Sequence, residues 1–221
     1  MTNPMTDYST LIRLDSAELT RALRRLAPPH APGQWIFALL DIARTDYYPV
    51  NQDRRISLTA RLAFASRLLD FVTRELRPRD AALVAREYLK VARHAIESAA
   101  QEVPPALQTD AVVARALECF ALTREQAMSV ATERRFRYAD ALSSDLSEAD
   151  FNSAVRTQGD KELSAITHLL QELQWFQGKA TDKAIADKLK SWIEIYPRLT
   201  LGREMTTQLN TRQKRLRGDL P

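Results

Sequence analysis

Residues 56–103 read ISLTARLAFASRLLDFVTRELRPRDAALVAREYLKVARHAIESAAQEV, and this stretch carries the clearest structural signal in the chain. In its first half, apolar residues return at alternating spacings of four and three, which places them on one side of an α-helix. Further apolar residues widen that side; the set is Leu58, Leu62, Phe64, Ala65, Leu68, Leu69, Phe71, Val72 and Leu76. The second half repeats the rhythm through Ala85, Leu89, Ala92, Ile96, Ala99 and Val103.

We therefore predict two long antiparallel helices joined at Arg77-Pro78-Arg79. Pro78 should end the first helix, because proline lacks the amide proton of a helix interior and disfavours helical geometry in the preceding residue. Asp80 is then expected to cap the second helix. The alanines of the second helix allow the two axes to approach closely.

In the rest of the chain, glycine and proline are placed as they are in all-helical proteins. It has only five glycines and ten prolines, and the glycines fall at or near breaks between periodic segments. Such use of the two helix breakers, outside stretches rich in Ala, Leu, Arg and Glu, is typical of helical proteins. We predict an all-α fold, an irregular multi-helix bundle of about eight to nine helices built around the helical hairpin of residues 56–103.

Side chains mark several helix ends in the second half. Thr123 with Gln126 has the spacing of a capping box and is expected to start a helix, and Ser147 is expected to start another. The helix begun at Ser147 is expected to be interrupted at Gly159, and a later helix is expected to end at Pro197.

A single helical domain over residues 1–221 is the favoured organisation. Helix pairs of about 45 to 50 residues invite comparison with helical repeats, but the pairs share no residue signature. The alternative is a division at the acidic, serine-containing segment 141–150, into an N-terminal bundle of residues 1–142 and a C-terminal subdomain of residues 147–221 with a basic tail.

The formal net charge of +4 is located at the C-terminus, because residues 198–221 contain six Lys or Arg and two acids. The first hairpin helix also has an excess of arginine. The acids of residues 140–150, which have no base among them, are one available internal partner.

Two sets of basic residues are candidates for binding nucleic acid or another anion. Arg67 and Arg74 are seven residues apart, as are Arg86 and Arg93, so each pair lines one side of its helix. The alternative is a solvated helix face, or for the tail a solvated helix end whose cations complement the helix dipole. The candidates are Arg61, Arg67, Arg74, Arg86 and Arg93 in the hairpin, and Arg212, Lys214, Arg215 and Arg217 in the tail.

Tyr47 and Tyr48, in the loop Asp46-Tyr47-Tyr48-Pro49, are candidates for a partner-binding surface, because exposed tyrosines give large contact area at small entropy cost. The alternative is that both tyrosines cover the end of the core. Residues 174–189 loosely resemble the opening half of a helix-turn-helix, but residues 190–196 continue as an apolar face where a turn is needed. We therefore interpret them as ordinary helix packing.

The chain offers little catalytic chemistry. His30, His94 and His168 are far apart and lack zinc-ligand spacing, and Cys119, beside Leu117, is interpreted as a small buried apolar residue. There is no nucleotide-binding glycine loop and no nucleophile elbow. We expect no catalytic residue, metal or cofactor.

A cytoplasmic location without a membrane span is expected. The single cysteine cannot form an intramolecular disulfide, residues 1–13 lack the pattern of a signal peptide, and no apolar run approaches 18 residues. The leading hypothesis is a non-catalytic helical protein that acts through protein–protein contacts, including self-association, as an adaptor or structural subunit of a larger assembly. The alternative is a nucleic-acid-binding protein, or a helical subunit of a nucleoprotein complex, that uses the arginine-rich helix faces and the basic tail. A third hypothesis is an enzyme with an unfamiliar helical active site.

Overall fold

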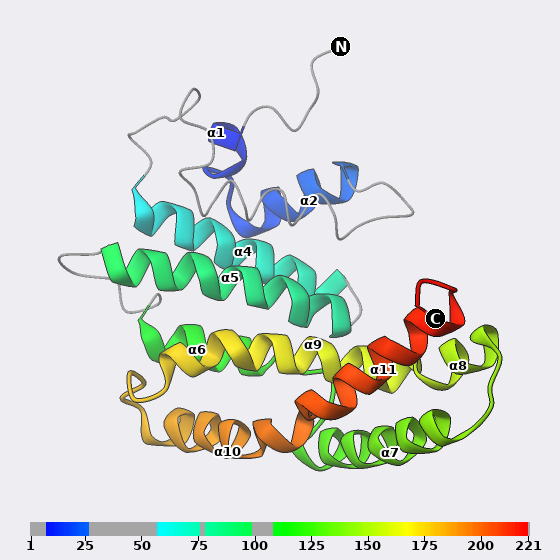
Figure 1. Ribbon diagram of the computed structural model, residues 1–221. Helices are drawn as coiled ribbons and strands as arrows, with labels where there is room; N and C mark the ends of the chain where they lie inside the picture. Colours follow the sequence, from blue (N-terminus) through cyan, green and yellow to red (C-terminus); the bar gives the residue numbers. More distant parts are fainter. Residues whose placement is uncertain (1–7, 27–56, 76–77, 99–107, 221) are drawn as a thin grey trace.

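The computed structural model describes residues 8–26, 57–75, 78–98 and 108–220, and every regular element in these ranges is a helix (Figure 1). The elements are α1 (Tyr8–Leu11), α2 (Ser16–Leu26), α4 (Leu58–Glu75), α5 (Pro78–Ser98), α6 (Thr109–Leu117), α7 (Arg124–Ser143), α8 (Glu148–Ala154), α9 (Gln158–Leu173), the 3-10 helix η3 (Gln174–Phe176), α10 (Lys183–Leu199) and α11 (Arg203–Leu216). The prediction of an all-α multi-helix fold is confirmed. No described helix is both long and apolar enough to cross a membrane.

The helices are stacked in layers. In Figure 1, α2 lies over α4, α4 over α5, and α5 over α9, while α10 and α7 form the lowest layer. The periodic apolar residues of α4 face this stack: Leu62, Ala65, Leu69 and Val72 are each fully buried or nearly so, and so are Phe64, Leu68 and Phe71. The predicted core side of α4 is therefore confirmed for these residues.

Helix α5 is buried on two sides, because it packs against α4 above and α9 below. The predicted stripe residues Ala85, Leu89 and Ala92 are buried, and Ile96 is half-buried against the core. Its second buried side, which the single predicted stripe does not include, consists of Ala81, Ala82, Val84, Tyr88 and Val91. A helix between two layers needs apolar residues over most of its circumference.

The connection between α4 and α5 differs from the prediction at its start. Helix α5 begins at Pro78 itself, so Asp80 lies inside the helix and is not its cap. Proline is favoured at the first helical position, because the amide it lacks has no partner there and its φ angle is already helical. The full hairpin of residues 56–103 stays a prediction, because residues 56, 76–77 and 99–103 lie outside the described ranges.

The helix starts predicted at Thr123 and Ser147 are confirmed. Thr123 and Gln126 form a capping box at the start of α7, and the Ser147 hydroxyl accepts a hydrogen bond from the Asp150 amide at the start of α8. The predicted break after the helix begun at Ser147 is present, but it lies between Ala154 and Gln158 and not at Gly159. Gly159 instead allows α9 to approach α7, since a Cβ there would lie 3.2 Å from Val130 Cγ1.

The helix end predicted at Pro197 is also misplaced, because α10 continues through Pro197 and ends at Leu199. A proline within the last turn removes only one helical hydrogen bond. Helix α10 is continuous over residues 183–199, so the turn that a helix-turn-helix needs after residue 189 is not present there.

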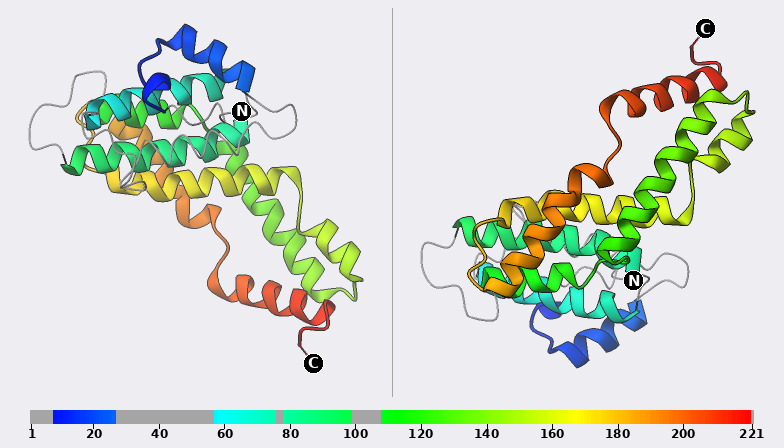
Figure 2. Two further views of the ribbon diagram at one scale, coloured as in Figure 1. Left: turned by 90° about the horizontal axis from the view of Figure 1, so that it is seen from above. Right: turned by 90° about the horizontal axis from the view of Figure 1, so that it is seen from below.

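Part of the fold projects from the stack. The C-terminal half of α7, α8 and α11 form a projecting unit, here called the arm, that extends to one side of the layers (Figure 2). Tyr138, Ala141 and Phe151 are buried in the arm but do not belong to the main core cluster. The main cluster joins residues from both sides of position 142, such as Leu68 and Ile166. The division of the chain into residues 1–142 and 147–221 stays a prediction.

Candidate functional site

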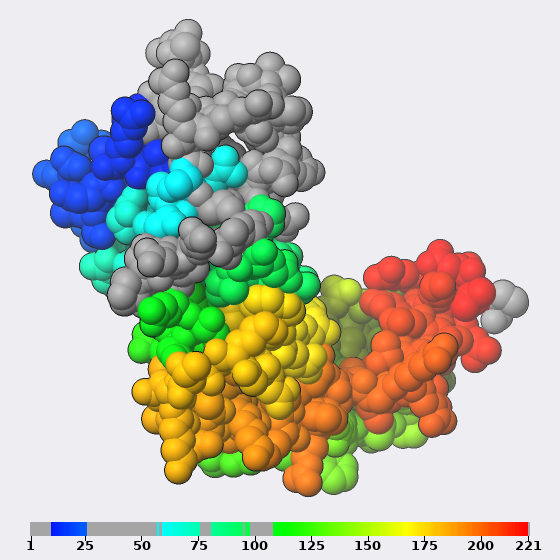
Figure 3. Space-filling model, turned by 90° about the vertical axis from the view of Figure 1, so that its left-hand side faces the viewer, coloured from blue at the N-terminus to red at the C-terminus, as the bar shows by residue number. Residues whose placement is uncertain are grey.

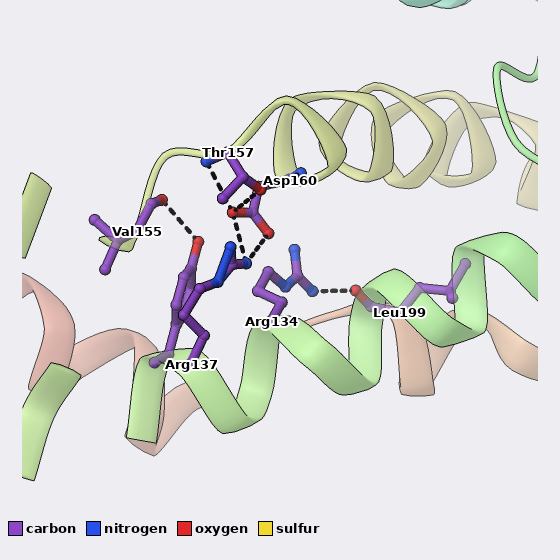
Figure 4. Close-up of polar contacts among 7 residues, drawn as sticks. Arg134, Arg137, Val155, Thr157, Asp160 and Leu199 are labelled. Atoms are coloured by element: carbon purple, nitrogen blue, oxygen red, sulfur yellow. Dashed lines mark hydrogen bonds and ion pairs between the residues drawn. The ribbon is translucent and has the colours of Figure 1, made fainter. Parts of the chain in front are cut away.

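A network of polar side chains ties α7 to α9 and α10, and we call it the α7 junction (Figure 4). Arg134 and Asp160 are the two charged residues that are buried among those the structure describes. A buried charge is stable only when it is paired or hydrogen-bonded, so the partners of these groups determine how α7 is held. The junction consists of Arg134, Arg135, Arg137, Tyr138 and Asp160.

Asp160 is the acceptor at the centre of the junction. Arg137 Nη2 donates to both carboxylate oxygens of Asp160, each at 2.9 Å. The same carboxylate accepts from the amide of Thr157 at 3.1 Å and from its hydroxyl at 2.8 Å, while the Asp160 amide donates back to the Thr157 hydroxyl at 3.3 Å. Asp160 therefore starts α9 through a capping box and pairs α9 with α7.

Two further arginines of α7 bind the C-terminal end of α10. Arg134 Nη2 donates to the carbonyl of Leu199, and Arg135 Nη2 donates to the carbonyls of Arg198 at 2.8 Å and Thr200 at 3.1 Å. The last carbonyls of a helix have no partner within the helix and carry partial negative charge, so guanidinium groups stabilise them. Burial lowers the pKa of Arg134, and the neighbouring Tyr138 and Asp160 act against this shift.

The aromatic residue of the junction fixes the loop before α9. The Tyr138 hydroxyl donates to the carbonyl of Val155 at 3.0 Å, and burial raises the pKa of Tyr138. The charged groups of the junction are thus hydrogen-bonded internally: Arg137 to the Asp160 carboxylate, and Arg134 and Arg135 to backbone carbonyls. We conclude that its chemistry is that of a rigid joint between three helices.

One large apolar residue lies on the outside of this joint. Phe136, between Arg135 and Arg137, is 74% exposed, against 40% for Leu220, the other exposed large apolar residue of the described ranges. Its neighbours at helical spacing are all exposed, and together they form the α7 outer face: Glu125, Ser129, Thr132, Glu133, Phe136, Ala139, Asp140 and Ser143.

The basic C-terminal helix binds the acidic part of the arm. Arg212 pairs with Asp145 at 3.5 Å and Arg217 with Glu148 at 3.6 Å, and Gln213 Nε2 donates to Asn152 Oδ1 at 3.2 Å. Two of the four acids of residues 140–150, Asp145 and Glu148, thus pair with the tail, whereas the sequence analysis offered these acids as partners of the first hairpin helix. Among the predicted tail residues, Lys214 and Arg215 are exposed and form no ion pair within the described residues.

Most of the candidate arginines of the hairpin, here called the arginine strip, form hydrogen bonds or ion pairs within the fold; the strip is Arg61, Arg67, Arg74, Arg86 and Arg93. Arg67 donates to the carbonyl of Ile12 at 2.8 Å, Arg86 pairs with Glu172 at 3.5 Å, and Arg93 pairs with Glu97 at 3.0 Å. Arg93 also lies 5.2 Å from the centre of the Trp175 ring. Arg61 is half-buried.

Arg74 is the exception in the strip, because it is exposed and donates only to the carbonyl of Asp70, at 3.0 Å, among the described residues. It lies beside Arg21 and Arg24 of α2, so the structure brings it together with two arginines that the sequence analysis did not select. The signal for them was the run Arg21-Ala22-Leu23-Arg24-Arg25.

The candidate partner-binding residues Tyr47 and Tyr48 lie outside the described residues.

The Cys119 thiol is buried and the His168 imidazole is half-buried. Cys119 is 3% exposed, its Sγ donates to the carbonyl of Arg115 at 3.4 Å, and burial raises its pKa to about 12. Burial also lowers the pKa of His168, and the charge of Arg86 contributes to the same shift. Within the described ranges, no group of three or more His, Cys, Asp or Glu residues is arranged to hold a metal ion.

Comparison with protein-family models, with curated proteins and with solved structures gives no match to this chain.

Proposed function

We propose that this chain is a non-catalytic helical protein that acts through protein–protein contacts, as an adaptor or structural subunit of a larger assembly in the cytoplasm. The observation that carries the proposal is the 74% exposure of Phe136 at the centre of the α7 outer face. Aromatic residues that anchor interfaces are typically surrounded by polar residues that contribute little to the binding free energy.

The support beneath Phe136 favours this role. Its two chain neighbours, Arg135 and Arg137, are bound to the carbonyls at the end of α10 and to Asp160. The backbone that carries Phe136 is therefore held from both sides, and a partner would not have to order it. A preorganised surface binds more tightly than a flexible one, because less conformational entropy is lost on binding.

The composition of the face suggests the chemistry of the partner. Ser129, Thr132 and Ala139 are small, so a partner helix can approach α7 closely around the phenylalanine. Glu133 and Asp140 give the face an acidic rim. The partner that fits best is a helical protein segment with an apolar pocket or stripe and basic flanks.

The hollow beside the arm adds a second contact region. Figure 3 shows α11 standing apart from α5, with an open gap between the two above α9. Because α7 lies on the other side of α9 from this gap (Figure 1), the gap is a contact region separate from the α7 outer face.

The proposal is tested by purifying the tagged chain from its source cells. We expect a stoichiometric partner with the wild-type protein and with Glu194→Ser, an exposed control position on α10. We expect the partner to be lost with Phe136→Ser, whose melting temperature should equal that of the wild type because the side chain is already exposed. Retention of the same partner by Phe136→Ser, or purification of the wild-type chain alone, would contradict the proposal.

Nucleic-acid binding is the second candidate, and the exposure of Lys214 and Arg215 at the end of α11 favours it. If these residues contact phosphates, binding to generic DNA and RNA should weaken steeply as salt is raised, and deletion of residues 212–221 should flatten that dependence. No binding at low salt would eliminate this candidate.

A further inference from the structure

Helix α11 is supported on one side only. It packs against α7 and α8 of the arm (Figure 2), and it stands apart from α5 across the open gap above α9 (Figure 3). None of its 14 residues is buried. Its side toward the arm is only half-buried, through Met205, Leu209, Arg212, Gln213 and Leu216. Such a helix is held weakly, because most of the stability of a helix in a protein comes from tertiary packing.

The ion pairs that join α11 to the arm are accessible to solvent. Arg212 pairs with Asp145 at 3.5 Å, and Arg217 pairs with Glu148 at 3.6 Å. Asp145 is fully exposed, and the side chains of Arg217 and Glu148 are 47% and 48% exposed. Exposed ion pairs contribute little net free energy, because water and salt screen them. These pairs therefore determine where α11 lies more than how tightly it is held.

The connection to α10 allows α11 to move as a unit. Arg135 binds the carbonyls of Arg198 and Thr200, so the end of α10 is fixed to α7. Only Leu201 and Gly202 separate Thr200 from the first residue of α11. Thr200 and Gly202 each have a ψ angle of 154°, which is typical of extended backbone. Rotation at Leu201 and Gly202 is therefore enough to move α11 away from the arm without disturbing α10.

The part of the arm that α11 contacts is held in place by bonds that do not involve α11. We call it the α7–α8 surface, and its polar residues are Asp145, Glu148 and Asn152. Asn152 Oδ1 accepts a hydrogen bond from Gln213 Nε2 at 3.2 Å. Tyr138 of α7 donates to the carbonyl of Val155, which follows the last residue of α8, so the two helices are joined directly. The surface can therefore persist when α11 leaves.

We propose that α11 is a displaceable occupant of the α7–α8 surface, and that this surface binds a basic amphipathic helix of a partner protein when α11 leaves. The contacts of α11 indicate the chemistry of that helix. It has apolar residues at the spacing of Met205, Leu209 and Leu216, and it has bases opposite Asp145 and Glu148. A partner helix that buries larger apolar residues there gains more free energy than α11, which buries none completely.

The proposal goes beyond the contact function argued from Phe136, because the α7–α8 surface shares no residue with the α7 outer face. Either surface can exist without the other. Their failures are distinguishable, since Phe136→Ser should leave binding at the α7–α8 surface unchanged.

Fluorescence anisotropy of a labelled peptide with the sequence of residues 201–220 tests the surface in the full chain. The wild-type chain should bind the peptide weakly, because its own α11 occupies the surface. The release variant Arg212→Glu/Arg217→Glu sets like charges against Asp145 and Glu148, so its own α11 should leave. We expect this variant to bind the peptide saturably, with a dissociation constant at least about tenfold lower than that of the wild type.

Two further variants separate displacement from a general effect of charge. Lys214→Glu/Arg215→Glu makes the same charge change on the exposed side of α11 and should bind the peptide as the wild type does. A fourfold variant adds Asp145→Lys and Glu148→Lys to the release variant. It restores opposite charges between the surface and its own α11, so it should again bind the peptide weakly.

Hydrogen exchange of the isotope-labelled wild-type chain gives a second measurement. Excess unlabelled peptide should speed exchange in the chain's own α11 and leave α4 and α5 unchanged. The melting temperature of the release variant should equal that of the wild type, because α11 has no buried residue.

The proposal is overturned by the absence of saturable binding to the release variant, by equally tight binding to the control variant, or by undiminished binding to the fourfold variant. Light scattering tests the other occupant, α11 of a second copy. A wild-type dimer that the release variant does not form would assign the surface to exchange of α11 between two copies, and it would overturn the proposal of a partner helix.

Discussion

Replacement of Asp160 by alanine should be among the most destabilising single changes at the α7 junction. The carboxylate is about nine-tenths buried, pairs with Arg137 and accepts two hydrogen bonds from Thr157. Loss of the charged hydrogen bonds costs about 1.5–3 kcal/mol, and loss of the capping interaction costs about a further 1 kcal/mol. The Arg137 side chain is 29% exposed, so it can regain water and the cost stays below that of a fully buried orphan charge.

We therefore expect Asp160→Ala to lower the free energy of unfolding by about 2–4 kcal/mol. Urea denaturation followed by far-ultraviolet circular dichroism measures this change, with an unchanged dependence on denaturant concentration. The matched control is Asp187→Ala, because Asp187 is exposed on α10 and should cost less than about 0.5 kcal/mol. Equal effects of the two substitutions would refute the role assigned to Asp160.

Three other predictions concern single groups and one helix. Cys119 should react with a thiol reagent at pH 8 far more slowly in the folded chain than in urea, because burial raises its pKa to about 12; equal rates would contradict the structure. His168 has a lowered pKa in the folded state, so it contributes stability above the unfolded pKa of about 6.5 and that contribution is lost as pH falls below it. The stability lost between pH 7.5 and 5.5 should therefore be smaller in His168→Gln than in the wild type, and an equal loss would disprove the assignment. Helix α11 has no buried residue and is tied to the rest of the arm by ion pairs that solvent reaches, so 1 M salt should increase its hydrogen exchange more than that of α4 and α5; a uniform increase would contradict this attachment.

The sequence predicted the features that depend on local chemistry. The four-three spacing of Leu62, Ala65 and Leu69 identified the buried side of α4, and the capping box of Thr123 and Gln126 identified the start of α7. These signals are local, because one turn of helix is enough to generate them.

The features that the sequence did not predict depend on which helices meet. A second buried side of α5 follows from its place between α4 and α9, and Pro197 is tolerated within a last turn whose carbonyls are bound by Arg134 and Arg135. Both effects come from elements distant in the chain, so no local pattern indicates them.

The candidate binding surfaces also depend on contacts between distant helices, which the sequence does not show. The seven-residue spacing of the arginines selected Arg67, Arg86 and Arg93, and these are engaged with a carbonyl, Glu172 and Glu97. Phe136 was detectable in principle, because Ala127, Ala131, Arg134, Tyr138 and Ala141 occupy the inner side of α7 and place position 136 outside. The apolar side of α7 was missed because Arg134 lies at its centre and a charged residue is not expected to be buried. The burial of Arg134 is explained by its hydrogen bond to the Leu199 carbonyl, which the sequence does not indicate.

The most direct test of the contact function is site-specific photocrosslinking in the source cells. Benzoylphenylalanine at position 136 preserves an exposed aromatic side chain there, and the same residue at position 194 on α10 is the control. We expect one discrete crosslinked protein from position 136 and none from position 194. The absence of a crosslink at position 136, or the same products from both positions, would contradict the account.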